Sequence, residues 1–179
     1  MNLVDLRIGV RGEQAVSRKI GLAAEVIGDL RDVFDEDLHP FMLDHMKSQF
    51  ATSGRHGGKP WASYDKEPKY TAYKIALVGH LDVLRWQKGG PFERLFPSLV
   101  DKTDVDHVWK TSGKSAQFGT RLKYAARLNE GGVGPFGESY PGRKMLAMTD
   151  QQKKLMITTI QRGIVSRIGA NTLRRARVT

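Results

Sequence analysis

The sequence predicts an α+β fold, in which a mostly antiparallel sheet of about four strands packs against N-terminal helices and a C-terminal helix. Three observations predict it. Residues 4–10 alternate apolar and polar side chains, which is typical of a half-buried strand. Apolar residues then recur at helical spacing over 13–50 and over 149–168. Between these segments lie shorter apolar runs separated by glycine-rich turns.

The N-terminal half begins with a strand and continues with helices. Pro40 interrupts the helical pattern of residues 13–50 because proline lacks an amide donor and clashes with the preceding turn, so we expect two consecutive helices. Residues 52–60 have the composition of a loop that leads to Trp61. Pro68 stands at a permitted first-turn position of a further helix, which Gly79 ends.

The C-terminal half predicts two or three strands within residues 81–119, carried by the apolar residues at 95–100 and 105–109. Residues 124–128 predict one or two helical turns that end at glycines, followed by a glycine-dense loop over 131–142. Residues 144–148 are expected to return to the sheet. Thr149 and Gln152 form a capping box for the last helix, and past Gly169 the chain is expected to be loose. We therefore predict one domain over 1–169 and a basic tail over 170–179.

Composition excludes several classes of protein. The chain has 179 residues, enough for one domain with a core, and 40% of them are hydrophobic, as in globular proteins. It has no cysteine, which excludes disulfides, thiolate nucleophiles and cysteine-ligated metal sites. Apolar runs are short, and Asp5 and Arg7 stand where a signal peptide needs apolar residues, so neither a membrane span nor a cleaved signal is predicted.

Charge is unevenly distributed along the chain. The net charge is +10, and residues 151–179 supply seven cations and no acid. Residues 25–44 carry seven acids against Arg31 alone. Two explanations are open: a basic end that binds nucleic acid or another polyanion, or complementary patches that pair one copy of the protein with the next.

No constellation of catalytic, cofactor or metal-binding residues emerges. The five histidines lack the spacing of metal ligands, and His45 on an apolar helix face is expected to be a core or interface residue. Gly57 and Gly58 lack the spacing of a phosphate-binding loop, and Ser98 and Ser115 lack a nucleophile elbow. The acids at 32–37 favour a solvated or partner-facing helix surface over a cation site. Tryptophans near basic residues could stack on nucleic-acid bases, but tryptophans in such sequences are more often core residues. The three tryptophans are Trp61, Trp86 and Trp109.

Four ordered segments resemble the virion morphogenesis and tail-completion family of tailed bacteriophages. The segments are Phe50 with 58–64 (GKPWASY) and Lys74; 79–81 (GHL) with 95–99 (LFPSL); 118–120 (FGT) with 124–132 (YAARLNEGG); and 140–146 (YPGRKML). Together they span roughly residues 30–168. The resemblance implies a non-enzymatic structural protein that forms a ring, with six-fold symmetry as the tail implies, at the neck or head-proximal end of the tail.

The partners that the resemblance implies are other copies of the chain, the tail tube, the head–tail connector and the genome DNA passing through the ring without specific recognition. No membrane and no cofactor is expected, and the location is the virion, after assembly in the host cytoplasm. A ring needs a contact between unlike patches, which the separated charges supply. Burial of Phe136 and Tyr140, in the loop 131–142, would add to that contact; the alternative is that this loop is a mobile hairpin tip at the surface. The candidate interface residues are Asp32, Asp35, Glu36, Asp37, Trp61, Phe136, Tyr140, Arg143, Arg162, Arg167, Arg174, Arg175 and Arg177.

The alternative function is a basic protein that binds nucleic acid without sequence specificity through its C-terminal arginines. An enzyme ranks third, because no arrangement of catalytic groups is apparent.

Overall fold

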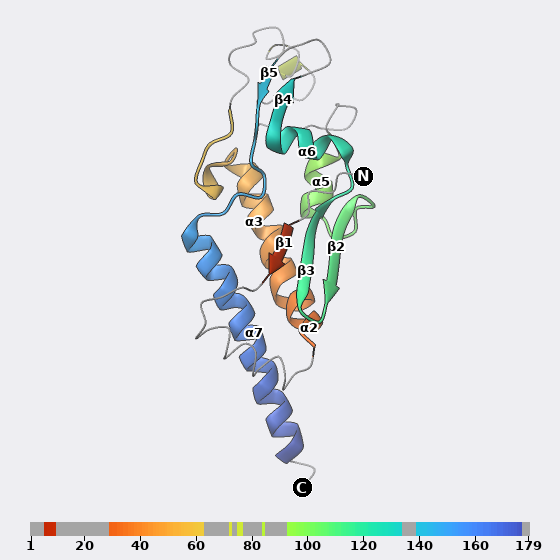
Figure 1. Ribbon diagram of the computed structural model, residues 1–179, viewed down its shortest axis with the longest axis vertical. Helices are drawn as coiled ribbons and strands as arrows, with labels where there is room; N and C mark the ends of the chain where they lie inside the picture. The colour runs from red at the N-terminus through yellow and green to blue at the C-terminus, as the bar shows by residue number, and fades with distance from the viewer. Residues whose placement is uncertain are drawn as a thin grey trace. The chain divides into compact units, whose positions relative to one another are not determined.

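The computed structural model describes residues 6–9, 29–62, 93–133 and 139–176, together with the isolated positions 72, 75, 76 and 84. Figure 1 shows the elements and their order. The chain divides into two compact units that interleave in sequence. Unit 1 comprises Met1–Asp5, Leu43–Val108 and Gly119–Thr149, and unit 2 comprises Leu6–Met42, Trp109–Phe118 and Asp150–Thr179. The prediction of one domain over 1–169 stays a prediction.

A three-stranded sheet has the order β1-β3-β2. Strand β1 (Leu6–Gly9) pairs antiparallel with β3 (Ser115–Thr120), and Leu6 lies opposite Phe118. Strand β2 (His107–Ser112) precedes β3 across a two-residue connection, Gly113 and Lys114. The first strand and the strand at 107–109 were predicted, and the class of mixed helix and sheet is confirmed. The expected four strands in one sheet are not confirmed among the described residues.

Residues 31–51 form one helical run rather than helices separated at Pro40. It consists of α2 (Arg31–Val33), a π-helical segment η1 (Phe34–Leu38) and α3 (His39–Ala51). The His39 N–H donates to the Phe34 carbonyl, five residues earlier. Because Pro40 cannot donate to a carbonyl of the preceding turn, widening that turn into a π segment lets the helix continue through it. The predicted break is therefore wrong, and a local π turn replaces it.

Unit 1 also contains η2 (Arg55–Gly57), α5 (Leu95–Val100) and α6 (Lys123–Glu130). The predicted strand at 95–100 is wrong: a short apolar run fits a buried strand or a buried helix equally well, and Pro97 is tolerated in the first turn of α5. The core includes Phe50, whose ring meets those of Trp61 and Phe96 edge-on at centroid distances of 5.2 Å. The predicted helical turns at 124–128 are confirmed in α6.

A two-stranded hairpin follows α6. Strand β4 (Gly131–Val133) pairs antiparallel with β5 (Ser139–Pro141), so part of the predicted glycine-dense loop is β-structure. Gly131 has φ +80° and Gly132 has φ +152°, conformations that favour glycine at the junction of helix and strand. Residues 144–148 form no strand, contrary to the prediction. Instead the Met145 N–H donates to the Asn129 side chain at 3.0 Å.

The last helix, α7, runs over Asp150–Ala176 in unit 2. It begins where the predicted capping box places it, and it continues past Gly169, so residues 170–176 of the predicted loose tail are helical. Within unit 2, α7 packs against α2 and η1 (Figure 1). Within the described residues, no helix combines the length and the apolar character needed to cross a bilayer. The helix predicted near 68–78 lies outside the described residues except for isolated positions.

Candidate functional site

The acidic segment and the basic C-terminal helix meet within one chain, at Arg167 of unit 2. One guanidinium nitrogen of Arg167 donates to Asp37 Oδ2 at 2.6 Å, and the other donates to Glu36 Oε2 at 2.6 Å. The carbonyl oxygens of Asp32 and Gly163 accept further hydrogen bonds at 3.0 and 3.1 Å. Two carboxylates and two backbone carbonyls therefore bind the guanidinium group of Arg167, and the arginine side chain is 22% exposed.

Two local features bring these groups together. The carboxylates of Glu36 and Asp37 lie on the π-helical segment η1, and both reach the same guanidinium. Gly163 lets α7 approach closely, because a Cβ there would collide with Asp37 Oδ2 and would lie 3.0 Å from Val33 Cγ1. Burial opposes the charge of Arg167, but the hydrogen bonds and charges of Asp37 and Glu36 outweigh it and raise the arginine pKa.

A second contact fixes Asp35 in the same unit. The Trp109 indole N–H donates to Asp35 Oδ1 at 2.6 Å. The His39 ring stacks on the Trp109 ring at 4.3 Å with an interplanar angle of 5°, and Phe118 meets Trp109 edge-on at 6.4 Å. Since His39 covers one face of the indole, the position of Trp109 favours the structural interpretation over stacking on a nucleic-acid base.

The outer face of α7 consists of Leu155, Thr158, Arg162 and Val165. These residues recur at i, i+3, i+7 and i+10, so they lie on one side of the helix, opposite the buried Ile160 and Ile164. Leu155 is 53% exposed and Val165 is 67% exposed, with the exposed Arg162 between them along the helix. Large aliphatic side chains at such exposure leave the outer face without apolar cover from the described residues.

Two predicted interface residues are buried in unit 1 instead. Trp61 is 5% exposed, contacts Phe50, and donates from its indole to the Lys144 carbonyl at 3.2 Å. Arg143 is 5% exposed, and its backbone N–H donates to the Leu128 carbonyl. Their assignment to a subunit interface is therefore corrected, because both side chains are buried within unit 1, where Arg143 Nε also donates to the Ala62 carbonyl at 3.4 Å.

The sequence predicted His45 as a core or interface residue, and its burial agrees with that, but the polar junction that it forms with Gln49 of the same helix, α3, was missed. His45 is 4% exposed, and its Nε2 lies 3.0 Å from the Ala147 carbonyl. The Gln49 side chain accepts from the Gly57 N–H at 2.6 Å and donates to the Lys144 carbonyl at 3.2 Å. The spacing of four residues places both side chains on one helix face, a signal that the sequence does offer. The junction ties residues 54–61 to residues 144–147.

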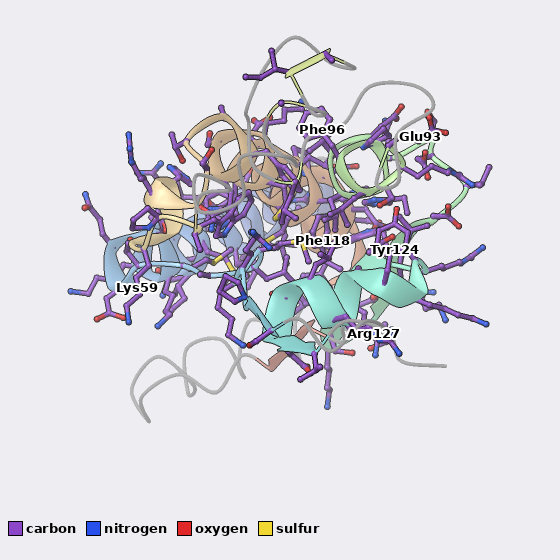
Figure 2. The ribbon with its side chains drawn as sticks, turned by 90° about the horizontal axis from the view of Figure 1, so that it is seen from above. Lys59, Glu93, Phe96, Phe118, Tyr124 and Arg127 are labelled. Carbon is purple, nitrogen blue, oxygen red and sulfur yellow. The ribbon has the colours of Figure 1, made fainter. Side chains whose placement is uncertain are left out.

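A second polar cluster in unit 1 surrounds Tyr124 of α6. Arg94 forms ion pairs with Asp106 at 2.9 Å and with Asp104 at 3.5 Å. Burial, followed by the charge of Asp106, raises the pKa of Tyr124 to about 12. Figure 2 labels Tyr124 and Glu93, whose negative charge also disfavours the tyrosinate. Within the described residues, no group of three or more histidine, aspartate or glutamate side chains is arranged to hold a metal ion.

The remaining candidate residues are only partly described. Tyr140 belongs to β5, and Arg174 and Arg175 belong to α7, where the structure gives the backbone. Phe136 and Arg177 lie outside the described residues. Comparison of the chain with protein-family models, curated proteins and solved structures finds no match.

Proposed function

We propose that this chain is a structural protein of a tailed phage virion that forms an oligomeric ring, six-fold as the tail implies, at the neck or head-proximal end of the tail. It completes the tail and joins it to the head connector, and the genome passes through the ring. The observation that carries this proposal is the outer face of α7, where two exposed aliphatic side chains, Leu155 and Val165, flank the exposed Arg162. The sequence resemblance supports the same function.

The occupant that we propose for the outer face of α7 is a second copy of the chain. Two α7 helices would repel each other, because residues 151–179 carry seven cations and no acid. The acidic side of α2 and η1 is complementary in charge, and Asp32 and Asp35 are exposed there. A contact between α7 of one copy and α2–η1 of the next joins unlike surfaces, and repetition of such a contact closes a ring.

Arg167 pairs with Glu36 and Asp37 within one chain, which reduces the number of charges that can attract a neighbouring copy. These three residues stabilise the fold of unit 2, so they are not available in full to a neighbouring copy. The attraction between copies then depends on Arg162 facing Asp32 and Asp35. A contact of this kind would bury the exposed Leu155 and Val165 on either side of Arg162, and arginine is among the residues that contribute most at the centres of protein interfaces.

Analytical ultracentrifugation of the purified chain at micromolar concentration, over a series of salt concentrations, tests the proposal. The substitutions Arg162→Glu and Val165→Ser are expected to shift the protein toward monomer. Lys153→Glu is the matched control and is expected to leave assembly unchanged. Lys153 is on the same helix, about 180° around the helix axis from Arg162. A ring that resists both interface substitutions, or a monomer under all conditions with virions that lack the protein, contradicts the proposal.

Nucleic-acid binding is the second candidate, favoured by the continuation of α7 to Ala176 with no acid after Asp150. The arginines of residues 170–179 would contact phosphates without reading sequence. DNA binding that falls steeply with salt and is lost on removal of residues 170–179, in a chain that stays monomeric, supports this candidate over the first.

A further inference from the structure

The junction around His45 fixes the tautomer of that histidine. The Ala147 carbonyl can only accept a hydrogen bond, so His45 Nε2 carries the proton and donates at 3.0 Å. Neutral His45 therefore has a bare Nδ1. This nitrogen is buried, and none of the residues that the structure describes offers it a hydrogen-bond partner. Protonation would place an N–H there without an acceptor, which is costly in a buried position.

A second histidine stands next to this position. The His56 ring of η2 lies 4.9 Å from the His45 ring, at an interplanar angle of 50°. Burial lowers the pKa of His45, the hydrogen bond to Ala147 opposes that effect, and the charge of His56 lowers the pKa further. On α3, the nearby charged residues Asp44 and Lys47 are exposed and pair with each other at 3.4 Å. Arg55 of η2 and Lys144 of the adjoining segment are also exposed.

The same junction leaves little space for rearrangement while it stays closed. A Cβ on Gly57 would lie 2.5 Å from the Ala147 carbonyl oxygen and 2.6 Å from Gln49 Nε2. The turn at 54–57 and the segment at 144–147 are thus in direct contact through the groups that His45 and Gln49 hold. Losing the His45 bond loosens the attachment of one segment to the other.

We propose that His45 is an acid-sensitive latch: in its neutral form it fastens residues 144–147 to α3 and to the turn at 54–61, and protonation at Nδ1 releases them. The latch acts within unit 1 and does not depend on the proposed assembly function. Release affects the segment that leads directly into α7 at Asp150.

The direction of the pH dependence follows from linkage. The pKa of His45 is lower in the closed form than in an open form, where it takes its ordinary value near 6.5. The closed form is therefore fully favoured above pH 6.5 and loses stability as the pH falls below it, by up to about tenfold in the opening equilibrium per pH unit. Once the pH is below the lowered pKa, the loss levels off.

Hydrogen exchange measured by NMR tests the latch. The reporters are the Gly57 amide and the Trp61 indole N–H, which donate to Gln49 and to the Lys144 carbonyl. Their protection factors, corrected for intrinsic exchange at each pH, should fall as the pH decreases from 7 to 5. Far-UV circular dichroism should stay constant over that range. The His45 ring signals should titrate with the same midpoint as the loss of protection.

His45→Gln and His56→Gln separate this mechanism from general acid instability. Glutamine at 45 can still donate to the Ala147 carbonyl but cannot titrate, so protection of both reporters should become independent of pH. His56→Gln removes the neighbouring positive charge and should raise the midpoint of His45. If His45→Gln does not fold, the wild-type chain provides the test. A loss of protection with the same midpoint as the His45 titration supports the proposal, and a different midpoint contradicts it. Loss of protection that disappears in His56→Gln, or that persists unchanged in His45→Gln, overturns the proposal.

Discussion

Replacing Arg167 by methionine removes a charged group from the contact between α7 and η1 and keeps an unbranched side chain of similar length. In the wild-type chain the guanidinium binds the Asp37 and Glu36 carboxylates and two backbone carbonyls. In Arg167→Met, Asp37 keeps its negative charge in a side chain only 31% exposed, with its main partner gone. The substitution is therefore expected to destabilise unit 2.

The loss of unfolding free energy in Arg167→Met can be estimated from the exposure of the two carboxylates that Arg167 binds. Glu36 is 71% exposed, and an ion pair with such a side chain contributes about 0.5 kcal/mol. The bond to Asp37 joins two partly buried charged groups, for which a loss of about 1.5 kcal/mol is typical. The total loss is about 2 kcal/mol, and it corresponds to a decrease of about 1 M in the urea midpoint if the denaturant slope is about 2 kcal/mol per molar.

Urea unfolding followed by circular dichroism measures this loss. Arg162→Met is the matched control, because Arg162 is exposed on the same helix and its removal should change stability by less than about 0.5 kcal/mol. Combining Arg167→Met with Asp37→Asn should give a coupling free energy of about 1 kcal/mol or more, since each change removes the same contact. Equal midpoints for Arg167→Met and Arg162→Met would refute the assignment of Arg167 to the fold.

Three further predictions concern packing, hydrogen bonding and pH. Gly163→Ala should destabilise the chain by about 2 kcal/mol in urea unfolding, because the new methyl group collides with the Asp37 carboxylate. Trp61→Phe should cost about 1 kcal/mol in the same assay, since the Lys144 carbonyl loses its indole donor. Tyr124 should titrate near pH 12 in ultraviolet absorbance. Because the folded chain holds this proton more tightly than the unfolded one, the free energy of unfolding should fall as the pH rises from 10 to 12, and Tyr124→Phe should abolish that contribution.

Elements with a long or regular pattern were predictable from the sequence. The strand at β1, the turns of α6 and the start of α7 follow from alternation, helical spacing and capping residues. The helix at 95–100 was not predictable, because six consecutive residues rich in apolar side chains carry no periodicity that separates a strand from a helix. The effect of Pro40 was also misjudged: its lost hydrogen bond is accommodated by one π turn, which local sequence does not reveal.

The side-chain contacts of the candidate site were also only partly predictable from the sequence. The sequence placed the acids at 32–37 and Arg167 among the functional residues, but charge alone does not tell whether partners lie within one chain or between two. Trp61 and Arg143 were among the predicted interface residues, but both are buried. Burial of both depends on the contact between residues 54–61 and 144–147, which lie more than 80 residues apart in sequence.

Arg162 and Arg167 show why formal charge is a poor guide to the surface available for assembly. They are five residues apart on α7, but one is exposed and the other is held by two carboxylates and two carbonyls. The attraction between acidic and basic segments, inferred from the sequence as a contact between copies, is thus partly satisfied inside each copy. In the proposed assembly, salt would therefore act on two separate equilibria, on folding through Arg167 and on association of copies through Arg162. Since exposed charges are screened more strongly than partly buried ones, assembly should weaken at salt concentrations that leave the fold intact.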